Sequence, residues 1–99
     1  MKLRSVAHSR AGDKGNLLNI SVIAYRDEDY PTLVERVTED RVTELFREHI
    51  SAPVVRYCVP NLCALNFILQ RHAADSLTRS LRLDAHGKSL SSLMLSLEI

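Results

Sequence analysis

The feature that most constrains the fold is a regular alternation of residue type between positions 17 and 25. Apolar side chains occupy every second position of this stretch: Leu18, Ile20, Val22 and Ala24. Side chains of a β-strand point alternately to opposite faces, so a period of two places all four apolar residues on one face. The stretch therefore predicts a strand at 18–25 with one buried face, and the rest of the chain must supply a layer that covers it.

Two consecutive helices are predicted after this strand, at 30–37 and 39–49. Asp29 is a candidate N-cap for the first, because Pro31 then falls in the first turn, where a missing N–H costs nothing. Thr38 is a candidate N-cap for the second, because acidic residues follow it in the first turn. The apolar stripe slips between Val37 and Val42, which indicates a break between the two helices.

The remaining segments complete a mixed pattern of strands and helices. A strand is expected at 2–8, another at 54–59, and a helix at 62–74 with Asn61 as its N-cap. A strand at 78–83, a turn at 84–88 and a final strand at 93–99 follow. The order β-β-α-α-β-α-β-β predicts an α+β fold, a two-layer sandwich of a mainly antiparallel sheet with helices on one face.

Size and composition indicate one globular domain over 1–99. The hydrophobic fraction is 45% and the charged fraction 25%, both ordinary for a folded domain. The net charge of +1 supplies no basic field for nucleic acid, and the basic residues are interleaved with acidic ones. We expect neither nucleic-acid nor membrane partners, and the two cysteines and the polar start of the chain favour reduced thiols in the cytoplasm.

The polar run at 9–16 is the strongest candidate for a functional site. Glycines let a backbone approach a ligand, and basic side chains in such a loop attract phosphate or carboxylate groups. The residue before it, His8, is a candidate proton donor or ligand contact. The candidate ligand-binding residues are His8, Arg10, Gly12, Asp13, Lys14, Gly15 and Asn16. The same residue types also serve a plain turn or a partner interface, so three interpretations stay open.

Several familiar chemistries do not fit the sequence. The run at 9–16 lacks the Gly-Lys-Ser/Thr of a phosphate-binding loop, and a strand is expected where a helix would have to follow. His8 and Ser9 are neighbours on an expected strand and point to opposite faces, which argues against a catalytic triad. Cys58 and Cys63 without further ligands favour buried structural thiols over zinc. We expect no catalytic residue, no metal and no cofactor.

Three segments together resemble the AtuA-like ferredoxin-fold domain. They are Arg10-x-Gly12-Asp13-Lys14-Gly15-Asn16, Pro60-Asn61-Leu62-x-Ala64-Leu65-Asn66-Phe67, and Ser80-Leu81-Arg82-Leu83-Asp84-x-x-Gly87-Lys88-x-Leu90. The resemblance implies a ferredoxin-like α+β fold. In larger relatives this domain follows a big domain that is linked to acyclic terpene catabolism and works on acyl-CoA intermediates. The resemblance therefore also implies a link of this chain to that catabolism. The family gives no catalytic residue to carry over.

Two functional hypotheses follow. The first is a non-catalytic accessory or assembly domain that binds a second copy of itself, as a homo-oligomer, or a separate large-domain polypeptide. The alternative is a binding module or small enzyme that uses the run at 9–16 on a small anion such as an acyl-CoA or a carboxylate.

Overall fold

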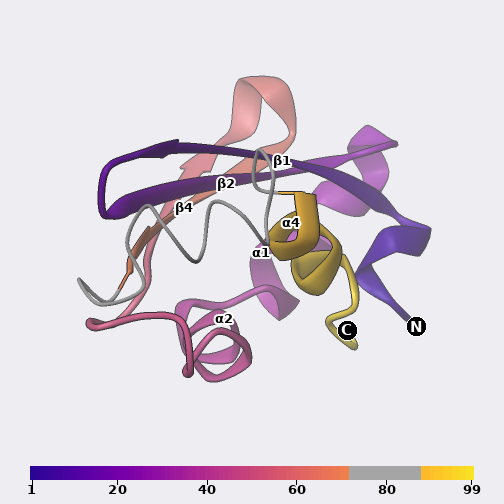
Figure 1. Cartoon of the computed structure of the whole chain (residues 1–99). Helices are drawn as coiled ribbons and strands as arrows, with labels where there is room; N and C mark the ends of the chain where they lie inside the picture. The colour runs from indigo at the N-terminus through magenta and orange to yellow at the C-terminus, as the bar shows by residue number, and fades with distance from the viewer. Residues whose placement is uncertain (72–87) are drawn as a thin grey trace.

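Four antiparallel strands form one open sheet in the computed structural model, which describes residues 1–71 and 88–99 (Figure 1). The strands are β1 (Ala7–Lys14), β2 (Leu17–Ala24), β3 (Val55–Val59) and β4 (Ala64–Gln70). Their order across the sheet is β1-β2-β4-β3, so two hairpins meet along the β2–β4 pair. Every neighbouring pair is antiparallel.

In the described part of the chain, three α-helices lie against the sheet: α1 (Tyr30–Arg36), α2 (Glu39–Leu45) and α4 (Lys88–Leu95). Short 3-10 turns occur at Leu3–Ser5, Asp27–Asp29 and Pro60–Leu62. In Figure 1 the helices gather below the sheet. The chain belongs to the α+β class, with an antiparallel sheet and helices in the ferredoxin-like manner, as the sequence predicts.

The predictions for residues 18–59 are confirmed in their main lines. The strand expected at 18–25 is β2, and its inward side chains are the four apolar ones. The break between two helices is correct, and the Thr38 hydroxyl accepts a hydrogen bond from the Arg41 N–H at 3.2 Å. Asp29 stands at the N-cap position of α1 with Pro31 in the first turn, as predicted, but its side chain makes no capping hydrogen bond.

The first strand lies later in the chain than the sequence predicts. Residues 3–5 form a 3-10 turn, and β1 begins at Ala7, so the supposed loop at 9–16 is mostly strand. Only Gly15 and Asn16 turn the chain. Gly15 has φ of 62°, which suits the first central position of a type II′ turn between paired strands.

Two elements in the second half of the chain have the opposite type from that predicted. The segment expected as a helix at 62–74 contains β4, and Asn61 lies in a 3-10 turn instead of capping a helix. The segment expected as a strand at 93–99 begins inside α4. The predicted strand at 78–83 and nearly all of the predicted turn at 84–88 lie outside the described residues.

The sheet has two faces of different character. The inner face packs against the helices and carries the apolar side chains of β2 and β4. The fully buried residues at its centre are Leu18, Ile20, Val22, Leu65, Phe67 and Leu69, and the helices cover them with Leu33, Val37, Val42, Phe46 and Met94. The opposite face, which we call the open face, carries the other set of alternate side chains.

The outer strand β3 is fastened to the helical layer through Arg56. Its guanidinium donates hydrogen bonds to the backbone carbonyls of Val34 and Val37, both at 2.8 Å. Its backbone N–H donates to a carboxylate oxygen of Glu39, also at 2.8 Å. The end of α1, the start of α2 and the edge of the sheet are therefore joined by one residue.

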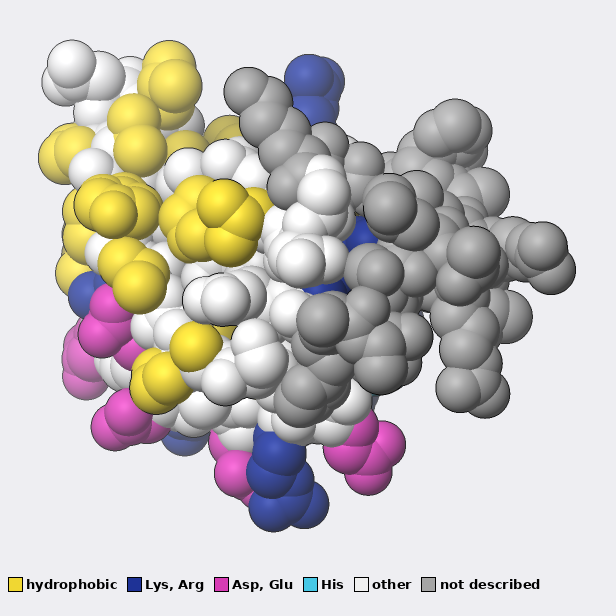
Figure 2. All heavy atoms as spheres, turned by 60° about the vertical axis from the view of Figure 1, so that its left-hand side comes forward, with side chains coloured by type: hydrophobic (Ala, Val, Ile, Leu, Met, Phe, Trp, Pro, Cys, Tyr) yellow, Lys and Arg dark blue, Asp and Glu magenta, His cyan; other side chains and the backbone are white. Residues whose placement is uncertain are grey.

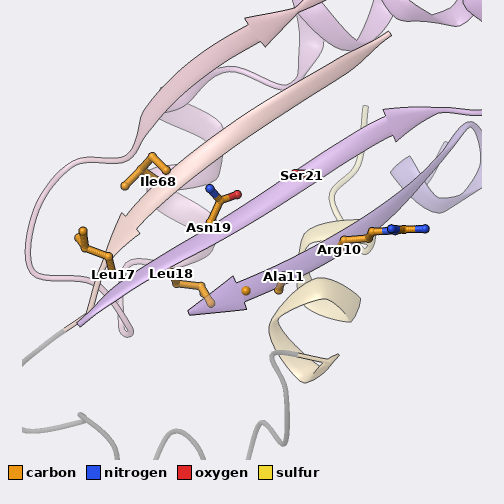
Figure 3. A pocket seen from close by; sticks show the side chains of 8 residues that line it. Arg10, Ala11, Leu17, Leu18, Asn19, Ser21 and Ile68 are labelled. Carbon is orange, nitrogen blue, oxygen red and sulfur yellow. The ribbon is translucent and has the colours of Figure 1, made fainter. Parts of the chain in front are cut away.

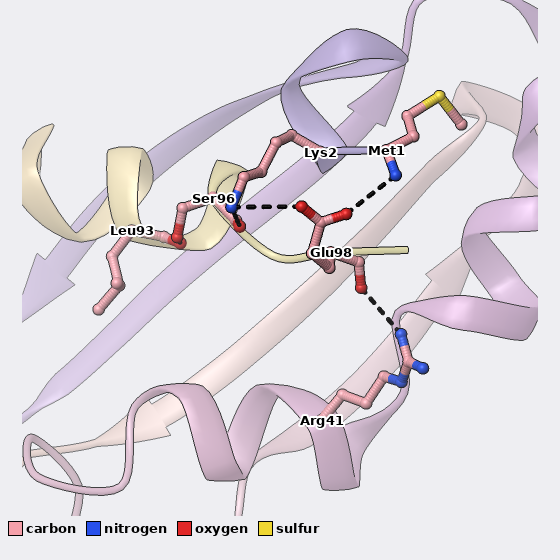
Figure 4. Close-up of polar contacts among 6 residues, drawn as sticks. All are labelled: Met1, Lys2, Arg41, Leu93, Ser96 and Glu98. Atoms are coloured by element: carbon pink, nitrogen blue, oxygen red, sulfur yellow. Dashed lines mark hydrogen bonds and ion pairs between the residues drawn. The ribbon is translucent and has the colours of Figure 1, made fainter.

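The two ends of the chain meet beside α2 (Figure 4). Glu98 accepts a hydrogen bond from the Met1 amino group at 2.9 Å, and its other carboxylate oxygen lies 3.4 Å from the Lys2 ammonium. The Arg41 guanidinium donates to the Glu98 backbone carbonyl at 2.9 Å. Since no turn of helix holds these last residues, these contacts keep the C-terminal segment in place.

These contacts make stability depend on pH. The hydrogen bond from the Met1 amino group, followed by that from Lys2, lowers the pKa of the Glu98 carboxyl. A lowered pKa in the folded state stabilises the fold above the ordinary glutamate pKa of about 4.3, and this contribution is lost as the pH falls through the lowered value. We expect Glu98→Gln to reduce the free energy of unfolding at neutral pH but not at low pH, as measured by urea denaturation. The same loss for Glu35→Gln, which removes an exposed carboxylate elsewhere, would contradict this assignment.

Candidate functional site

The open face is organised in rows that cross all four strands. Strand register aligns Arg10 with Ser21, Ser21 with Asn66, and Asn66 with Tyr57. We call these four residues the polar row. The row on one side consists of His8, Ile23, Ala64 and Val59, and the row on the other consists of Gly12, Asn19, Ile68 and Val55. A polar line thus runs between two rows that are mainly apolar.

Large hydrophobic side chains are exposed mainly on or beside this face. Of the six that are exposed among the described residues, five belong to it: Leu17, Tyr25, Val55, Tyr57 and Leu62. Figure 2 shows hydrophobic side chains gathered in the upper part of the molecule, which is the sheet side in Figure 1, and acidic side chains mainly in the lower part. Exposed apolar side chains gathered on one face in this way are typical of a binding face.

Two adjoining hollows open on this face. The first, of about 520 Å³, is lined by residues of β1, β2 and β4 and holds Leu17 and Ile68 at one side. The second, of about 490 Å³, lies toward His8 and Leu62. Both share Arg10, Asn19 and Ser21. In Figure 3, Asn19 and Ile68 stand on one side of the sheet while Leu18 and Ala11 point to the other.

The charge of the two hollows is positive. Arg10 is exposed and has no hydrogen-bond or ion-pair partner among the residues described, and no acidic side chain from that part of the chain lines either hollow. His8 stacks on Tyr25 with ring centroids 5.4 Å apart, which fixes an aromatic pair beside the row. Ser21 donates a hydrogen bond to the Asn66 side-chain oxygen at 3.3 Å. An anionic group would therefore meet a guanidinium and amide donors without a competing carboxylate.

Gly12 helps to form the first hollow because it carries no side chain. A Cβ built on it would meet no atom within 4 Å, and its φ is not in the left-handed region. The backbone therefore does not require glycine here, unlike at Gly15. The space beside Arg10 depends on the residue type at position 12.

The candidate residues from the sequence do not form one compact site. His8, Arg10 and Gly12 reach the open face, whereas Gly15 and Asn16 form the hairpin turn at the far end of β1. Asp13 and Lys14 pair with Leu18 and Leu17 as the last residues of β1, and the structure describes only their backbone. Seven strand residues span about 24 Å, so a ligand at His8 does not reach the turn. The interpretation of 9–16 as a single polar loop is wrong.

Sequence reasoning missed the part of the site that comes from β2, β3 and β4. Asn19, Ser21 and Tyr57 lie on the outward side of strands that were correctly predicted, but only the register shows that they align with Arg10. Asn66 and Ile68 were assigned to a helix, where they would not share a face with them. Polar residues at alternate positions opposite the buried face were the available signal.

The prediction that both cysteines are buried is wrong. Cys58 is exposed and Cys63 is half-buried, and both are free thiols. Cys63 has φ of 51°, at the start of β4, and its thiol donates to the Asp27 carboxylate at 3.3 Å. This hydrogen bond raises the pKa of the Cys63 thiol, which disfavours the reactive thiolate.

Burial raises the pKa of the nearby Tyr30 hydroxyl, which donates to the Ala64 carbonyl at 3.1 Å.

Within residues 1–71 and 88–99, no three His, Cys, Asp or Glu side chains are grouped so as to hold a metal ion. None of the helices described there has the length and apolar character needed to cross a membrane.

The buried Ser9 hydroxyl points away from His8, on the inner face, and has no partner among the residues described. The predicted separation of His8 from Ser9 is confirmed.

Comparison with known proteins gives a family. No curated protein and no solved structure matches the chain. The family model described as the AtuA ferredoxin-like domain matches residues 1–99, which is the whole chain. The resemblance carried by the segments at 10–16, 60–67 and 80–90 is thereby confirmed, and the chain belongs to the AtuA ferredoxin-like domain family.

Proposed function

We propose that this domain is a non-catalytic accessory domain that docks through its open face onto a separate, larger polypeptide. The observation that carries the proposal is the concentration of exposed large hydrophobic side chains on that one face. Tyr57 and Leu62 are 56% and 68% exposed, although each is large enough to contribute strongly when covered. Covering them against another protein removes apolar area from water, which is the dominant favourable term in association.

Charge favours a different polypeptide over a second copy as the partner. Two copies joined through their open faces would bring together surfaces that each carry the Arg10 guanidinium and, among the described residues, no acid in the hollows. Like charges facing each other in an interface cost binding energy. A partner with an apolar surface that bears acidic side chains has no such conflict.

The family supplies the kind of partner. The family is described as the AtuA ferredoxin-like domain. The resemblance in the sequence implies larger relatives that carry this domain after a big domain in one chain. We propose that the big domain is here a separate polypeptide, that the assembly works in the cytoplasm, and that it serves acyl-CoA or acyclic terpene catabolism.

The test is direct binding to the large domain of an AtuA-type protein, produced on its own. We expect isothermal titration calorimetry and light scattering to show a one-to-one complex. Tyr57→Asp combined with Leu62→Asp should weaken binding at least about tenfold, because a charge is then buried where an apolar contact was made. Arg36→Ala, on the exposed side of α1, is the matched control and should leave the affinity unchanged.

Two binding results would each refute the docking role. One is the absence of any complex with the large domain. The other is a complex of unchanged affinity for the Tyr57→Asp/Leu62→Asp variant. Dimers of the domain alone that disappear in this variant would assign the same face to a second copy, against the proposal.

A further inference from the structure

We propose that Arg10 and the first hollow form a receptor for a carboxylate carried next to an apolar group, supplied by an aspartate or glutamate side chain of the docking partner. This inference rests on the proposed docking role and specifies its chemistry. It assigns the recognition step to one side chain and one neighbouring space on the open face.

Arg10 is free to bind an external group. It lies on β1 in the polar row, beside both hollows, and it is exposed without a hydrogen-bond or ion-pair partner among the described residues. The other arginine on a strand, Arg56, makes two hydrogen bonds to carbonyl oxygens. A guanidinium presents its donors in a planar fork that matches a carboxylate in two parallel hydrogen bonds. Arg10 is therefore available to an external anion.

Further polar groups lie beside Arg10. Asn19 and Ser21 line both hollows with it, and the amide of Asn19 has no hydrogen-bond partner among the residues described. Ser21 and Asn66 are bonded to each other, which holds the centre of the row in a fixed arrangement. An anion at Arg10 gains an amide donor and, among the described lining residues of either hollow, meets no carboxylate.

The apolar side of the first hollow favours one class of anion. Leu17 and Ile68 form the apolar side of the first hollow, and the missing side chain of Gly12 keeps the space beside Arg10 open. A bare inorganic anion gains nothing from apolar walls, whereas an aliphatic group attached to a carboxylate is removed from water there. The volume of about 520 Å³ lies in the range of small-molecule pockets.

Aliphatic carboxylates serve as the probe. We expect octanoate, titrated into the isotope-labelled domain, to shift the backbone amide resonances of Arg10, Gly12, Asn19 and Ile68. Octylamine has the same tail with the opposite charge and should shift them far less. Equal shifts with both probes, or octanoate shifts confined to other parts of the chain, would overturn the inference.

Two variants test the site without disturbing the fold. Arg10→Ala should weaken octanoate binding about tenfold or more, the loss expected for one charge-assisted contact. Gly12→Val should weaken it similarly by filling the hollow, while thermal unfolding shows the variant at least as stable as the original, since a β-branched residue suits a strand. Arg36→Ala is the control for the loss of one exposed arginine.

The large domain distinguishes this inference from the docking role. If both are correct, Arg10→Ala weakens the complex and octanoate competes with the large domain. A complex that forms normally with Arg10→Ala leaves the docking role standing and overturns the carboxylate receptor. Binding of octanoate at Arg10 in the absence of any complex overturns both the docking role and the assignment of the carboxylate to a protein partner.

Discussion

Phe67→Ala is expected to destabilise the domain by about 4 kcal/mol, the usual range for removing a fully buried phenylalanine being about 3–5 kcal/mol. Phe67 lies at the centre of β4, opposite Ile20, and is completely buried. The helices that cover Phe67 are held by their own contacts, so they cannot move in far enough to fill the cavity that the substitution leaves. Urea denaturation followed by circular dichroism measures the change. Since small domains are only marginally stable, the variant should be partly unfolded at 37 °C.

Tyr57→Ala is the matched control for this loss. It also removes an aromatic ring from a strand, but Tyr57 stands on the open face and is 56% exposed. Its free energy of unfolding should change by less than about 1 kcal/mol, as for most surface substitutions. Equal destabilisation by Phe67→Ala and Tyr57→Ala would mean that the two faces of the sheet are not buried and exposed as described.

Arg56→Ala is expected to destabilise the domain by about 2 kcal/mol, because hydrogen bonds to charged groups are worth about 1.5–3 kcal/mol and the site is only partly buried. The variant leaves the carbonyls of Val34 and Val37 without their donor. These carbonyls lie at the C-terminal end of α1, where the helix itself supplies no partner. The change is measured by urea denaturation, and hydrogen exchange should show earlier opening of α1 than of β2.

Arg56→Lys and Arg36→Ala are the controls. A lysine ammonium is compact and should restore only part of the lost stability, because it does not reproduce the arginine fork. Arg36→Ala removes an exposed arginine from the same helix end and should cost well under 1 kcal/mol. An Arg56→Ala variant as stable as Arg36→Ala would show that the two carbonyl contacts contribute nothing.

The class of the fold was predictable because β2 and the two helices after it carry strong local signals. Leu18 to Ala24 alternate without interruption, and Thr38 caps a helix through its hydroxyl as its sequence context predicts. Local pattern and tertiary packing agree at these positions. Where the two agree, the secondary structure of a segment can be predicted from its sequence.

The position of β1 was not predictable from hydrophobicity. Its inward residues are Ala7, Ser9 and Ala11, which are small because α4 packs closely over this strand. A strand whose buried face is small and partly polar looks like a loop when apolar residues are counted. The two glycines strengthened that mistaken interpretation, although only Gly15 takes a turn conformation.

The exchange of helix and strand in the second half has a physical cause as well. Leu65, Phe67 and Leu69 alternate, but the apolar residues between and beside them also fit a helical stripe. Pairing with both β2 and β3 decides in favour of a strand, and those partners are far away in the sequence. In α4, some of the leucines alternate as in a strand, and some are spaced as on one face of a helix. Packing against β1 decides in favour of the helix.

The candidate site was half predictable for the same reason. Arg10 and Gly12 stand out in the sequence as a cation and a glycine in one polar run. That they face Asn19 and Ser21, and not Asp13 or the turn, follows only from the register of β1 against β2. A site built across strands becomes visible once the sheet is assembled.

The hydrogen bond from the Arg56 backbone to Glu39 has a consequence for growth of the sheet. An outer strand normally offers its unused N–H groups to any extended segment that arrives, which is the route to fibres and swapped assemblies. Here a helix of the same chain has already occupied that donor. A fifth strand added beside β3 would have to displace this carboxylate first, so the edge is protected at Arg56 against extension of the sheet.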